Sequence, residues 1–242
     1  MTGTPRAGEG EVSHPPAPPA VSRRAGAPQV KICCIASIDE AALAIAHGAS
    51  ALGLVSHMPS GPGVVDEARI AEIIATVPPS VATFLLTSAT DAAAILAQQR
   101  RMRPTTLQLV DHLGTDVHQA LRDALPGIQL VQVVHVEDEE SVAYALTAAA
   151  SVDALLLDSG RLKAPVRELG GTGRTHDWSL SRRIRDEAGK PIFLAGGLRA
   201  GNVAEAIRTV EPFGLDLCTG VRTDGALDEM KLAAFMHSVR QA

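Results

Sequence analysis

The chain has 242 residues, of which 46% are hydrophobic and only 2% aromatic, so aliphatic side chains must build its core. Its formal net charge of −5 and pI near 5.9 argue against nucleic-acid binding, which needs a basic surface, and favour a small ligand. Three cysteines without the spacing of a disulfide framework indicate a reducing compartment and predict a cytoplasmic protein. No apolar stretch is long enough for a transmembrane helix, so no membrane contact is expected.

The first segment, residues 1–28, is rich in Pro, Gly, Ala and Ser and includes the run His14-Pro-Pro-Ala-Pro-Pro. Such a composition buries too little apolar surface to offset the entropy lost on folding. The segment also lacks an apolar block that would serve as a signal sequence. We therefore predict a disordered leader over residues 1–28 and a single folded domain over residues 29–242.

From Val30 onward, eight short aliphatic runs alternate with longer segments of helical periodicity. The runs are too short for helices and too evenly apolar for a sheet with one wet face, which is typical of buried parallel strands. They cover residues 30–35, 51–55, 81–86, 105–110, 128–134, 152–157, 191–195 and 213–218. Capping residues mark several helix starts. These are Ser37, with Glu40 completing a capping box, Asp66, Asp177, Asn202 and the Asp224-Gly225 pair.

Eight strand–helix units predict a closed (β/α)8 barrel, the TIM barrel, as a single domain. A doubly wound open sheet is the alternative, because it shares the alternation of strands and helices. That fold usually has fewer units and often a Gly-rich first turn, where this chain has Cys33-Cys34-Ile35. In a barrel, functional residues lie at the carboxyl ends of the strands, so candidates are sought there.

Two of the three cysteines are adjacent at the end of the first run. Neighbouring side chains of a strand point to opposite faces, so we expect Cys33 to share a face with Lys31 and Ile35. Cys34 is then expected on the other face with Ile32. One thiol is available for chemistry and the other for packing, although any single cysteine is more often an inert packed residue.

Asp158 closes the sixth run directly after a series of apolar residues. A carboxylate at this point is unfavourable to bury unless it has partners. Its alternative role is to cap a surface turn. Because the position is a strand end at the expected functional mouth, we predict a functional carboxyl group.

Glycines follow each of the last three runs, and they predict a phosphate site. The backbone N–H groups of glycine-rich loops can turn toward an anion, and the loops after strands seven and eight of a barrel commonly hold phosphate. Each segment alone could be a tight turn, but all three are expected at one end of the barrel. The candidate binding residues are Gly171, Gly173, Gly196, Gly197, Thr219 and Gly220.

Together these motifs resemble the phosphoribosylanthranilate isomerase family, barrel enzymes of tryptophan biosynthesis. The resemblance runs from Val30 to the C-terminal helix, and its motifs stand in the family's order. They are Lys31-Ile-Cys33 with Ile35, Leu155-Leu-Leu-Asp158, Gly170-Gly-Thr-Gly173, Asp177-Trp178, Leu194-Ala-Gly-Gly-Leu198, Asn202-Val203 and residues 216–221.

The resemblance implies an intramolecular oxidoreductase that carries out the Amadori rearrangement of N-(5-phosphoribosyl)anthranilate, a phosphorylated sugar–amine. Its product is 1-(2-carboxyphenylamino)-1-deoxyribulose 5-phosphate. Asp158 matches the general acid that protonates the sugar ring oxygen, and Cys33 matches the general base that removes the proton from C2. Lys31 is close enough to help stabilise a Cys33 thiolate, while Cys34 stands where the family usually has Gly.

Three departures from the family pattern concern the aglycone, the amine part of the substrate. Gly63 falls where the family has the Arg that holds the anthranilate carboxylate, and Arg222 replaces a Glu. Residues 108–112, Gln-Leu-Val-Asp-His, replace the family's Gln-Leu-His-Gly. A carboxylate at the mouth still needs a cation, so Arg222 is predicted to bind it, ahead of Arg161 and Lys163.

Two alternatives stay open. One keeps the same chemistry on a phosphoribosyl amine with a different aglycone. The other is a phosphosugar-binding barrel without catalysis, against which the presence of both Cys33 and Asp158 argues. No cofactor or metal is expected, since the eight histidines form no His-x-His or His-Glu-x-x-His arrangement.

Overall fold

A computed structural model gives the structure of the protein and describes residues 27–160 and 173–242. Eight of its strands overlap the eight aliphatic runs. They are β1 (Gln29–Ile32), β2 (Ala51–Val55), β3 (Ala82–Thr87), β4 (Thr106–Leu109), β5 (Gln129–His135), β6 (Ala154–Asp158), β7 (Ile192–Leu194) and β8 (Gly214–Leu217). The leader proposed for residues 1–28 remains a prediction, because residues 1–26 lie outside the described part.

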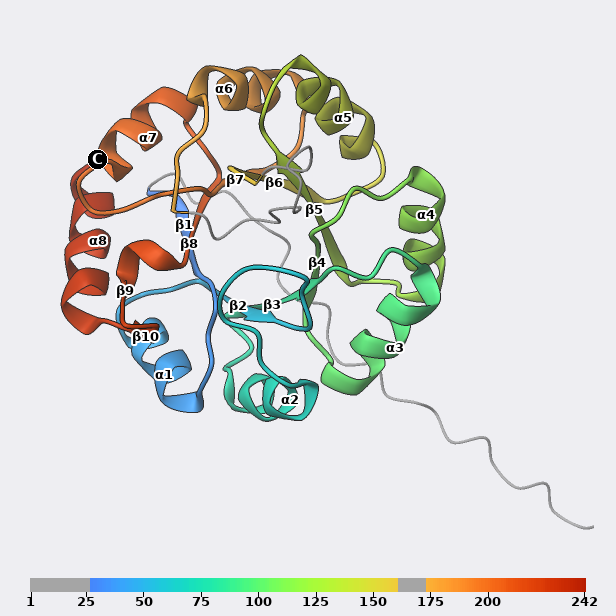
Figure 1. Cartoon of the computed structure of the whole chain (residues 1–242), viewed down its shortest axis with the longest axis horizontal. Coiled ribbons are helices and arrows are strands. Elements are labelled where there is room, and N and C mark those ends of the chain that lie inside the picture. The colour runs from blue at the N-terminus through green and yellow to red at the C-terminus, as the bar shows by residue number, and fades with distance from the viewer. Residues whose placement is uncertain (1–26, 161–172) are drawn as a thin grey trace, which may run out of the picture.

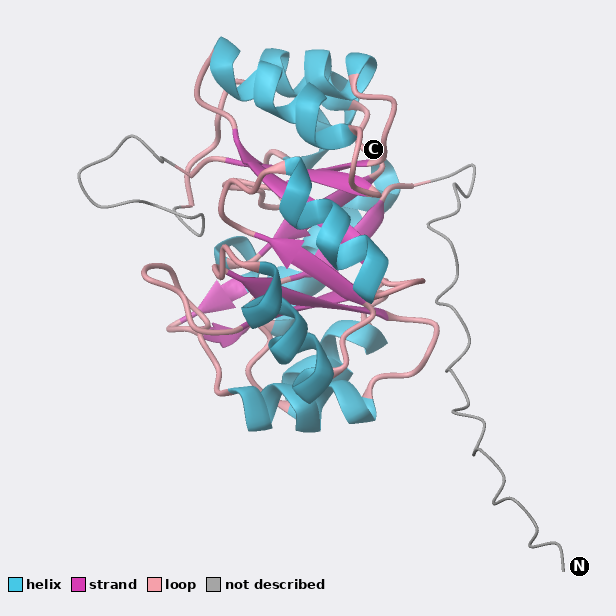
Figure 2. Cartoon of the chain, turned by 90° about the vertical axis from the view of Figure 1, so that its right-hand side faces the viewer, coloured by secondary structure: helices cyan, strands magenta, loops and turns pink. Residues whose placement is uncertain are grey.

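The strands pair in chain order, and β8 pairs in parallel with β1 to close a barrel. Helices surround this ring (Figure 1), and in the side view the strands run between helices on either side (Figure 2). The closed ring confirms the TIM barrel and excludes the doubly wound open sheet. None of the helices in the described residues is long and apolar enough to cross a membrane.

Side-chain caps begin most of the helices where the sequence predicts them. The Oγ of Ser37 and a carboxylate oxygen of Asp66 each accept a hydrogen bond from a backbone N–H of the first turn. Asp177 does the same at its own helix. The helices are α1 (Ile38–Ala46), α2 (Glu67–Thr76), α3 (Ala92–Met102), α4 (Thr115–Ala124), α5 (Glu139–Ala149), α6 (Trp178–Glu187), α7 (Val203–Val210) and α8 (Glu229–Gln241).

The segment before the last helix differs from the prediction. Asp224 and Gly225 form the turn of a short hairpin, β9 (Arg222–Thr223) and β10 (Ala226–Leu227), instead of the start of α8. Both turn residues have positive φ values, 49° and 83°, which such a tight turn requires. The N-cap of α8 is Asp228, whose carboxylate accepts from Lys231 N–H.

Buried apolar side chains form two layers. The larger one packs the outside of the barrel against the helices and includes Ile32 and Ile35. The smaller one fills the barrel itself. There the rings of Phe84 on β3 and Phe193 on β7 pack edge to face, with their centroids 5.6 Å apart. Alternate strand residues supply the two layers, as the pleat of a barrel strand dictates.

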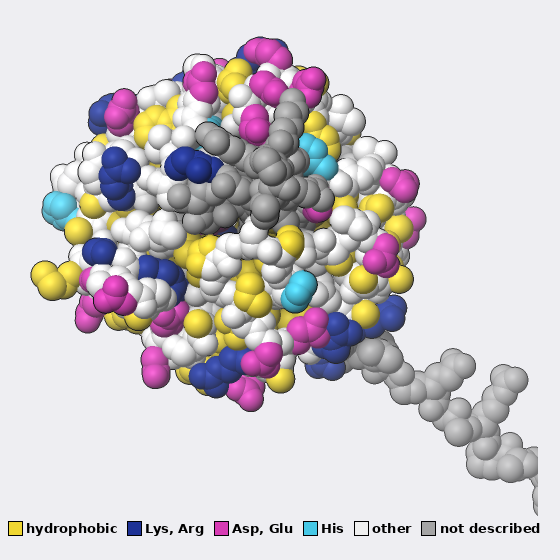
Figure 3. Space-filling model, viewed as in Figure 1, with side chains coloured by type: hydrophobic (Ala, Val, Ile, Leu, Met, Phe, Trp, Pro, Cys, Tyr) yellow, Lys and Arg dark blue, Asp and Glu magenta, His cyan; other side chains and the backbone are white. Residues whose placement is uncertain are grey.

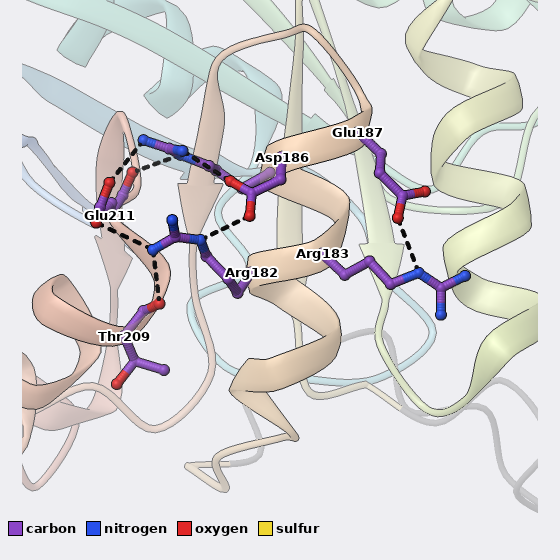
Figure 4. A network of polar contacts seen from close by, with 7 residues as sticks. Arg182, Arg183, Asp186, Glu187, Thr209 and Glu211 are labelled. Carbon is purple, nitrogen blue, oxygen red and sulfur yellow. Dashed lines mark hydrogen bonds and ion pairs between the residues drawn. The ribbon is translucent and has the colours of Figure 1, made fainter.

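Ion pairs outside the barrel link α6 to the end of α7 (Figure 4). The guanidinium of Arg182 contacts Asp186 at 2.8 Å and Glu211 at 3.1 Å. Because these groups are exposed to solvent, each pair contributes at most about 1 kcal/mol. This network therefore supports the outer surface and takes no part in the site described below.

Candidate active site

One pocket opens at the carboxyl ends of the strands, which face the viewer in Figure 1. On this face the charged side chains lie mainly toward the edge, and hydrophobic side chains gather nearer the middle (Figure 3). Of the predicted site residues, seven line the pocket. They are Cys33, Asp158, Gly173, Gly196, Gly197, Thr219 and Gly220. Gly171, Arg161 and Lys163 lie outside the described residues.

A buried ion pair lies next to the pocket, which Asp216 lines while Lys31 is fully buried behind it. The Nζ of Lys31 lies 2.8 Å from a carboxylate oxygen of Asp216, its register partner on β8. Burial is the largest single effect and would lower the pKa of Lys31, but attraction to Asp216, Cys33 and Cys34 and the hydrogen bond to Asp216 together outweigh it, so the pKa is raised and the ammonium is kept. The site thus has a fixed positive charge close to Cys33.

The Cys33 thiol lies near this ammonium group, and the residue is only 6% exposed. A side chain on Gly53 of β2 would lie 2.8 Å from Cys33 Sγ and 2.9 Å from Lys31 Nζ, so the bare glycine leaves room for both groups. Hydrogen bonding from the Cys34 thiol, the Lys31 charge and the Cys34 amide lower the pKa of Cys33, against burial and Asp216. The environment favours a thiolate.

The expectations that Cys34 shares a face with Ile32 and Cys33 with Ile35 are both wrong, because the two isoleucines pack in the outer layer. Strand β1 ends at Ile32, and Cys34 has a left-handed backbone with φ of 64°. Strand alternation therefore stops before the two cysteines, and both belong to the apolar layer inside the barrel. Hydrogen bonding with Cys218 and Cys33, together with burial, raises the pKa of Cys34, which remains a thiol.

Asp158 ends β6 on the far wall of the same pocket. Its partial burial among apolar strand residues raises its pKa from 3.8 to about 6. The N–H of Ser159 donates to the carboxylate at 2.7 Å and opposes this rise, as does the Lys31 charge, while Asp216 adds to it. The carboxyl group therefore keeps its proton closer to neutral pH than an exposed Asp does.

At the carboxyl ends of β7 and β8, the pocket is built mainly from the backbone of glycines. Gly196 and Gly197 have φ values of 82° and 61°, and a side chain on Gly197 would lie 2.8 Å from the carbonyl oxygen of Arg174. Asn202 does not cap α7 with its side chain. Its amide nitrogen donates instead to Gly197 O at 3.0 Å and holds the glycine loop.

The opposite end of the pocket is an apolar wall from the loops and strand ends of β2 to β4. It is lined by Val55, Met58, Pro62, Leu86 and Val110. The His112 that follows β4 stacks on Tyr144 of α5, with ring centroids 3.8 Å apart, and does not line the pocket.

Arg222 has partners other than the ligand that we expected. Its guanidinium pairs with Glu40 at 2.8 Å and donates to the carbonyl oxygen of Cys34 at 2.6 Å. The side chain is only 7% exposed and does not line the pocket. Arg222 is therefore engaged in holding the chain after β1, and the structure does not place it where it would bind an aglycone carboxylate.

Two residues that line the pocket, Asp216 and Gln108, and one beside Cys33, Gly53, were not among the predicted site residues. Asp216 and Gly53 are found only once the strands are placed side by side, although Asp216 belongs to a family motif quoted above. Gln108 of β4 is 3% exposed and lines the pocket, and its Oε1 has no hydrogen-bond partner among the described residues. A buried polar atom at a pocket wall is suited to a substrate hydroxyl or amine.

A closed barrel that brings the carboxyl group of Asp158 and the thiol of Cys33 to one pocket at its mouth has the arrangement of a barrel isomerase. The sequence pattern of the N-(5'-phosphoribosyl)anthranilate (PRA) isomerase family matches residues 30–238. The chain belongs to the N-(5'-phosphoribosyl)anthranilate isomerase family.

Relatives and solved structures agree. The N-(5'-phosphoribosyl)anthranilate isomerase of Haloferax volcanii is 36% identical over 218 residues, which cover 88% of this chain and 94% of the relative. Isomerase 2 of Methanosarcina mazei is 33% identical over 214 residues, with the same two coverages. A crystal structure of phosphoribosyl anthranilate isomerase in complex with reduced 1-(o-carboxyphenylamino)-1-deoxyribulose 5-phosphate matches with a TM-score of 0.73 at 25% identity, covering 89% of this chain and 100% of the other.

Proposed function

We infer that the chain is an aldose–ketose isomerase of tryptophan biosynthesis, which converts N-(5'-phosphoribosyl)anthranilate to 1-(2-carboxyphenylamino)-1-deoxyribulose 5-phosphate. Membership of the family and the names of its relatives support this function. The observation that carries it is the pairing, in one pocket, of a carboxyl group with a raised pKa and a thiol with a lowered pKa. These opposite shifts suit one acid and one base.

Asp158 is the general acid of the first step. With a pKa of about 6, roughly a tenth of these carboxyl groups are protonated at pH 7, against about one in a thousand at the usual value. The proton goes to the furanose ring oxygen as its bond to C1 breaks. The amine nitrogen supplies the electron pair that forms the C=N bond, which yields an open-chain Schiff base.

Cys33 is the general base of the second step. Its thiolate removes the proton from C2, and the electron pair of that C–H bond forms the C1=C2 double bond while the nitrogen regains its lone pair. The resulting enol becomes the ketone when C1 takes up a proton. Lys31 supports this step, because its positive charge stabilises the nearby thiolate. One positioned acid or base contributes about 100- to 10,000-fold in rate.

The substrate phosphate is assigned to the glycine end of the pocket. Gly173, Gly196, Gly197, Thr219 and Gly220 line this end, and glycines allow an anion to approach the backbone closely. Gly171 belongs to the same proposal, although it lies outside the described residues. A cytoplasmic location is also part of the proposal, supported by three free cysteines.

A second candidate function keeps this chemistry but takes a different aglycone. No Lys or Arg is among the described residues that line the pocket, and Gly63 stands where the family has its carboxylate-binding Arg. Arg222 is paired with Glu40. These observations favour an amine partner that lacks a carboxylate, although membership of the family favours anthranilate.

The two candidates separate in a direct assay of the purified protein. We expect it to convert N-(5'-phosphoribosyl)anthranilate and to rescue a tryptophan auxotroph that lacks the isomerase. The same assay uses the phosphoribosyl derivative of aniline, which has no carboxylate. A higher kcat/KM for the aniline compound, without rescue, supports the second candidate. A folded protein that converts neither compound contradicts both.

A further inference from the structure

Two of the departures from the family pattern and the residue in place of the family's first-strand Gly lie together in space. These residues, Gly63, Arg222 and Cys34, come from distant parts of the chain. A side chain on Gly63 would collide with the Cβ of Cys34 and lie 2.9 Å from its Sγ. Arg222 donates to the carbonyl oxygen of the same cysteine. Cys34 is therefore the centre of one altered unit.

The backbone of Cys34 is strained. Its φ of 64° lies in the left-handed region, which glycine enters freely and most other residues do not. A residue with a side chain is held there only when its surroundings impose the conformation. The turn of residues 33–36 must therefore be fixed by contacts from outside.

Arg222 supplies such contacts. One terminal nitrogen, Nη2, donates to the carbonyl oxygens of Cys34 at 2.6 Å and Cys33 at 3.3 Å. Both terminal nitrogens also bond to the two carboxylate oxygens of Glu40, at 2.8 and 3.0 Å. A two-point contact of this kind fixes the plane of the guanidinium and so fixes the carbonyls that it binds.

Glu40 completes the connection. Its carboxylate accepts from the N–H of Ala36, at the end of the turn, at 3.0 Å, and from the N–H of Leu227 in the hairpin at 2.9 Å. Although burial opposes ionisation, bonds from Arg222, Leu227 and Ala36 hold the pKa of Glu40 below its usual value. The carboxylate therefore stays charged and anchors both ends of the turn.

We propose that Arg222, anchored by Glu40, is a positioning residue that holds the left-handed turn at Cys34 and thereby sets the surroundings of the Cys33 sulfur. This rests on the proposed function only in taking Cys33 as the catalytic base. Cys33 and Cys34 belong to the same turn, and Arg222 donates to the carbonyl oxygens of both. The neighbouring Cys34, whose thiol donates to the carbonyl oxygen of Pro62 at 3.7 Å, also lowers the pKa of Cys33. We call the paired Arg222 and Glu40 the clamp. In the family pattern the position of Cys34 is Gly and that of Arg222 is Glu, so in this chain the clamp occurs together with the cysteine.

The test removes the clamp in two backgrounds. Arg222→Ala is made in the natural chain and in Cys34→Gly, where glycine adopts the turn without help. The readouts are kcat, KM and the pH dependence of Cys33 alkylation by iodoacetamide, located by peptide mass spectrometry. The other groups that face the Cys33 sulfur or share its pocket are unchanged in the Arg222 variant. They are Lys31 on β1, Asp216 and Cys218 on β8 and beyond it, and Asp158 on β6.

In the natural chain we expect kcat to fall about 10- to 100-fold while KM changes little, because a displaced base slows the chemical step without touching the phosphate end. Cys33 alkylation should need a higher pH. In the Cys34→Gly background, Arg222→Ala should change kcat less than about threefold. Equal losses in the two backgrounds overturn the proposal, as does an unchanged alkylation profile.

Two further variants keep the test decisive. Arg240→Ala removes an exposed arginine of α8 and should leave all three readouts unchanged. If Arg222→Ala does not fold, Glu40→Gln takes its place, since it weakens the anchor without emptying space. Wild-type kcat and a wild-type alkylation profile in Glu40→Gln contradict the proposal. The alkylation readout needs no substrate, so it decides the matter even if the protein does not turn over the proposed substrate.

Discussion

The two ends of the pocket are built in different ways. The end at the carboxyl ends of β7 and β8 is made mainly of backbone, with Gly196 and Gly197 in conformations that residues with side chains rarely adopt. The end near β2 to β4 is made of side chains such as Met58, Leu86 and Val110. The glycine end keeps the family's motifs, and the changes cluster at the other end.

This difference shows where such a pocket can take new residues while its acid and base stay in place. The glycine end tolerates little substitution at Gly197 and Gly220, because a side chain on either would collide with neighbouring main chain. Residues at the other end depend on one another sterically, because a side chain on Gly63 would collide with Cys34. Family resemblance is therefore a stronger guide to the phosphosugar end than to the aglycone end.

The largest expected effect concerns the buried ion pair between Lys31 and Asp216, next to the pocket. Lys31→Met leaves Asp216 charged and unpaired in the barrel, which should lower the free energy of unfolding by about 3–5 kcal/mol. Adding Asp216→Asn removes the unpaired charge and should restore part of that loss. Urea denaturation of the single and double variants measures both. A double variant that is less stable than Lys31→Met would contradict this account of the ion pair.

The next effect tests the acid through the pH dependence of stability. Because the pKa of Asp158 rises from 3.8 to about 6 on folding, the folded protein carries a penalty for the ionised carboxylate at high pH. Asp158→Asn removes it, so the variant should be more stable than wild type above about pH 6, by at most about 3 kcal/mol. The difference should vanish below about pH 4. A gain that is the same at all pH values would show that burial does not shift this carboxyl group.

The aglycone end is probed by restoring the family's arginine. Gly63→Arg should destabilise the protein by about 1–3 kcal/mol, because its Cβ collides with Cys34 and its φ of 80° is unfavourable for a side chain. Cys34→Gly should relieve part of this loss when combined with it. In the double variant, kcat/KM for the anthranilate compound should rise relative to the aniline compound. If the two substitutions change stability additively, then positions 34 and 63 are not coupled and this account of the aglycone end is contradicted.

The glycine end is probed by Gly197→Ala. The new Cβ would lie 2.8 Å from the carbonyl oxygen of Arg174, so we expect KM for the phosphorylated substrate to rise about tenfold, or roughly 1.4 kcal/mol. Gly189→Ala is the matched control. It has nearly the same φ, 62°, but nothing within 4 Å of its Cβ. If both variants raise KM alike, the effect is not specific to the pocket.

The sequence predicts the barrel well because eight buried strands and their helix caps are local patterns. It also brings Cys33 and Asp158 to the same end, since Cys33 directly follows β1 and Asp158 closes β6. It does not predict the conformation of Cys34, because strand alternation was extended two residues beyond the end of β1. Nor does it predict the partner of Arg222, since Glu40 is distant in sequence and only the closed barrel brings the two together.

The central claim is that Cys33, and not its neighbour, is the base. The most direct measurement is therefore kcat for Cys33→Ala and Cys34→Ala with N-(5'-phosphoribosyl)anthranilate, with folding checked by circular dichroism. Cys33→Ala should lose about 100- to 10,000-fold, because it removes the base itself. Cys34→Ala keeps the side-chain Cβ and the turn held by Arg222 but loses the thiol and its hydrogen bond to Pro62 O, so it should lose no more than about tenfold. Equal losses in two folded variants would contradict the assignment of the base to Cys33.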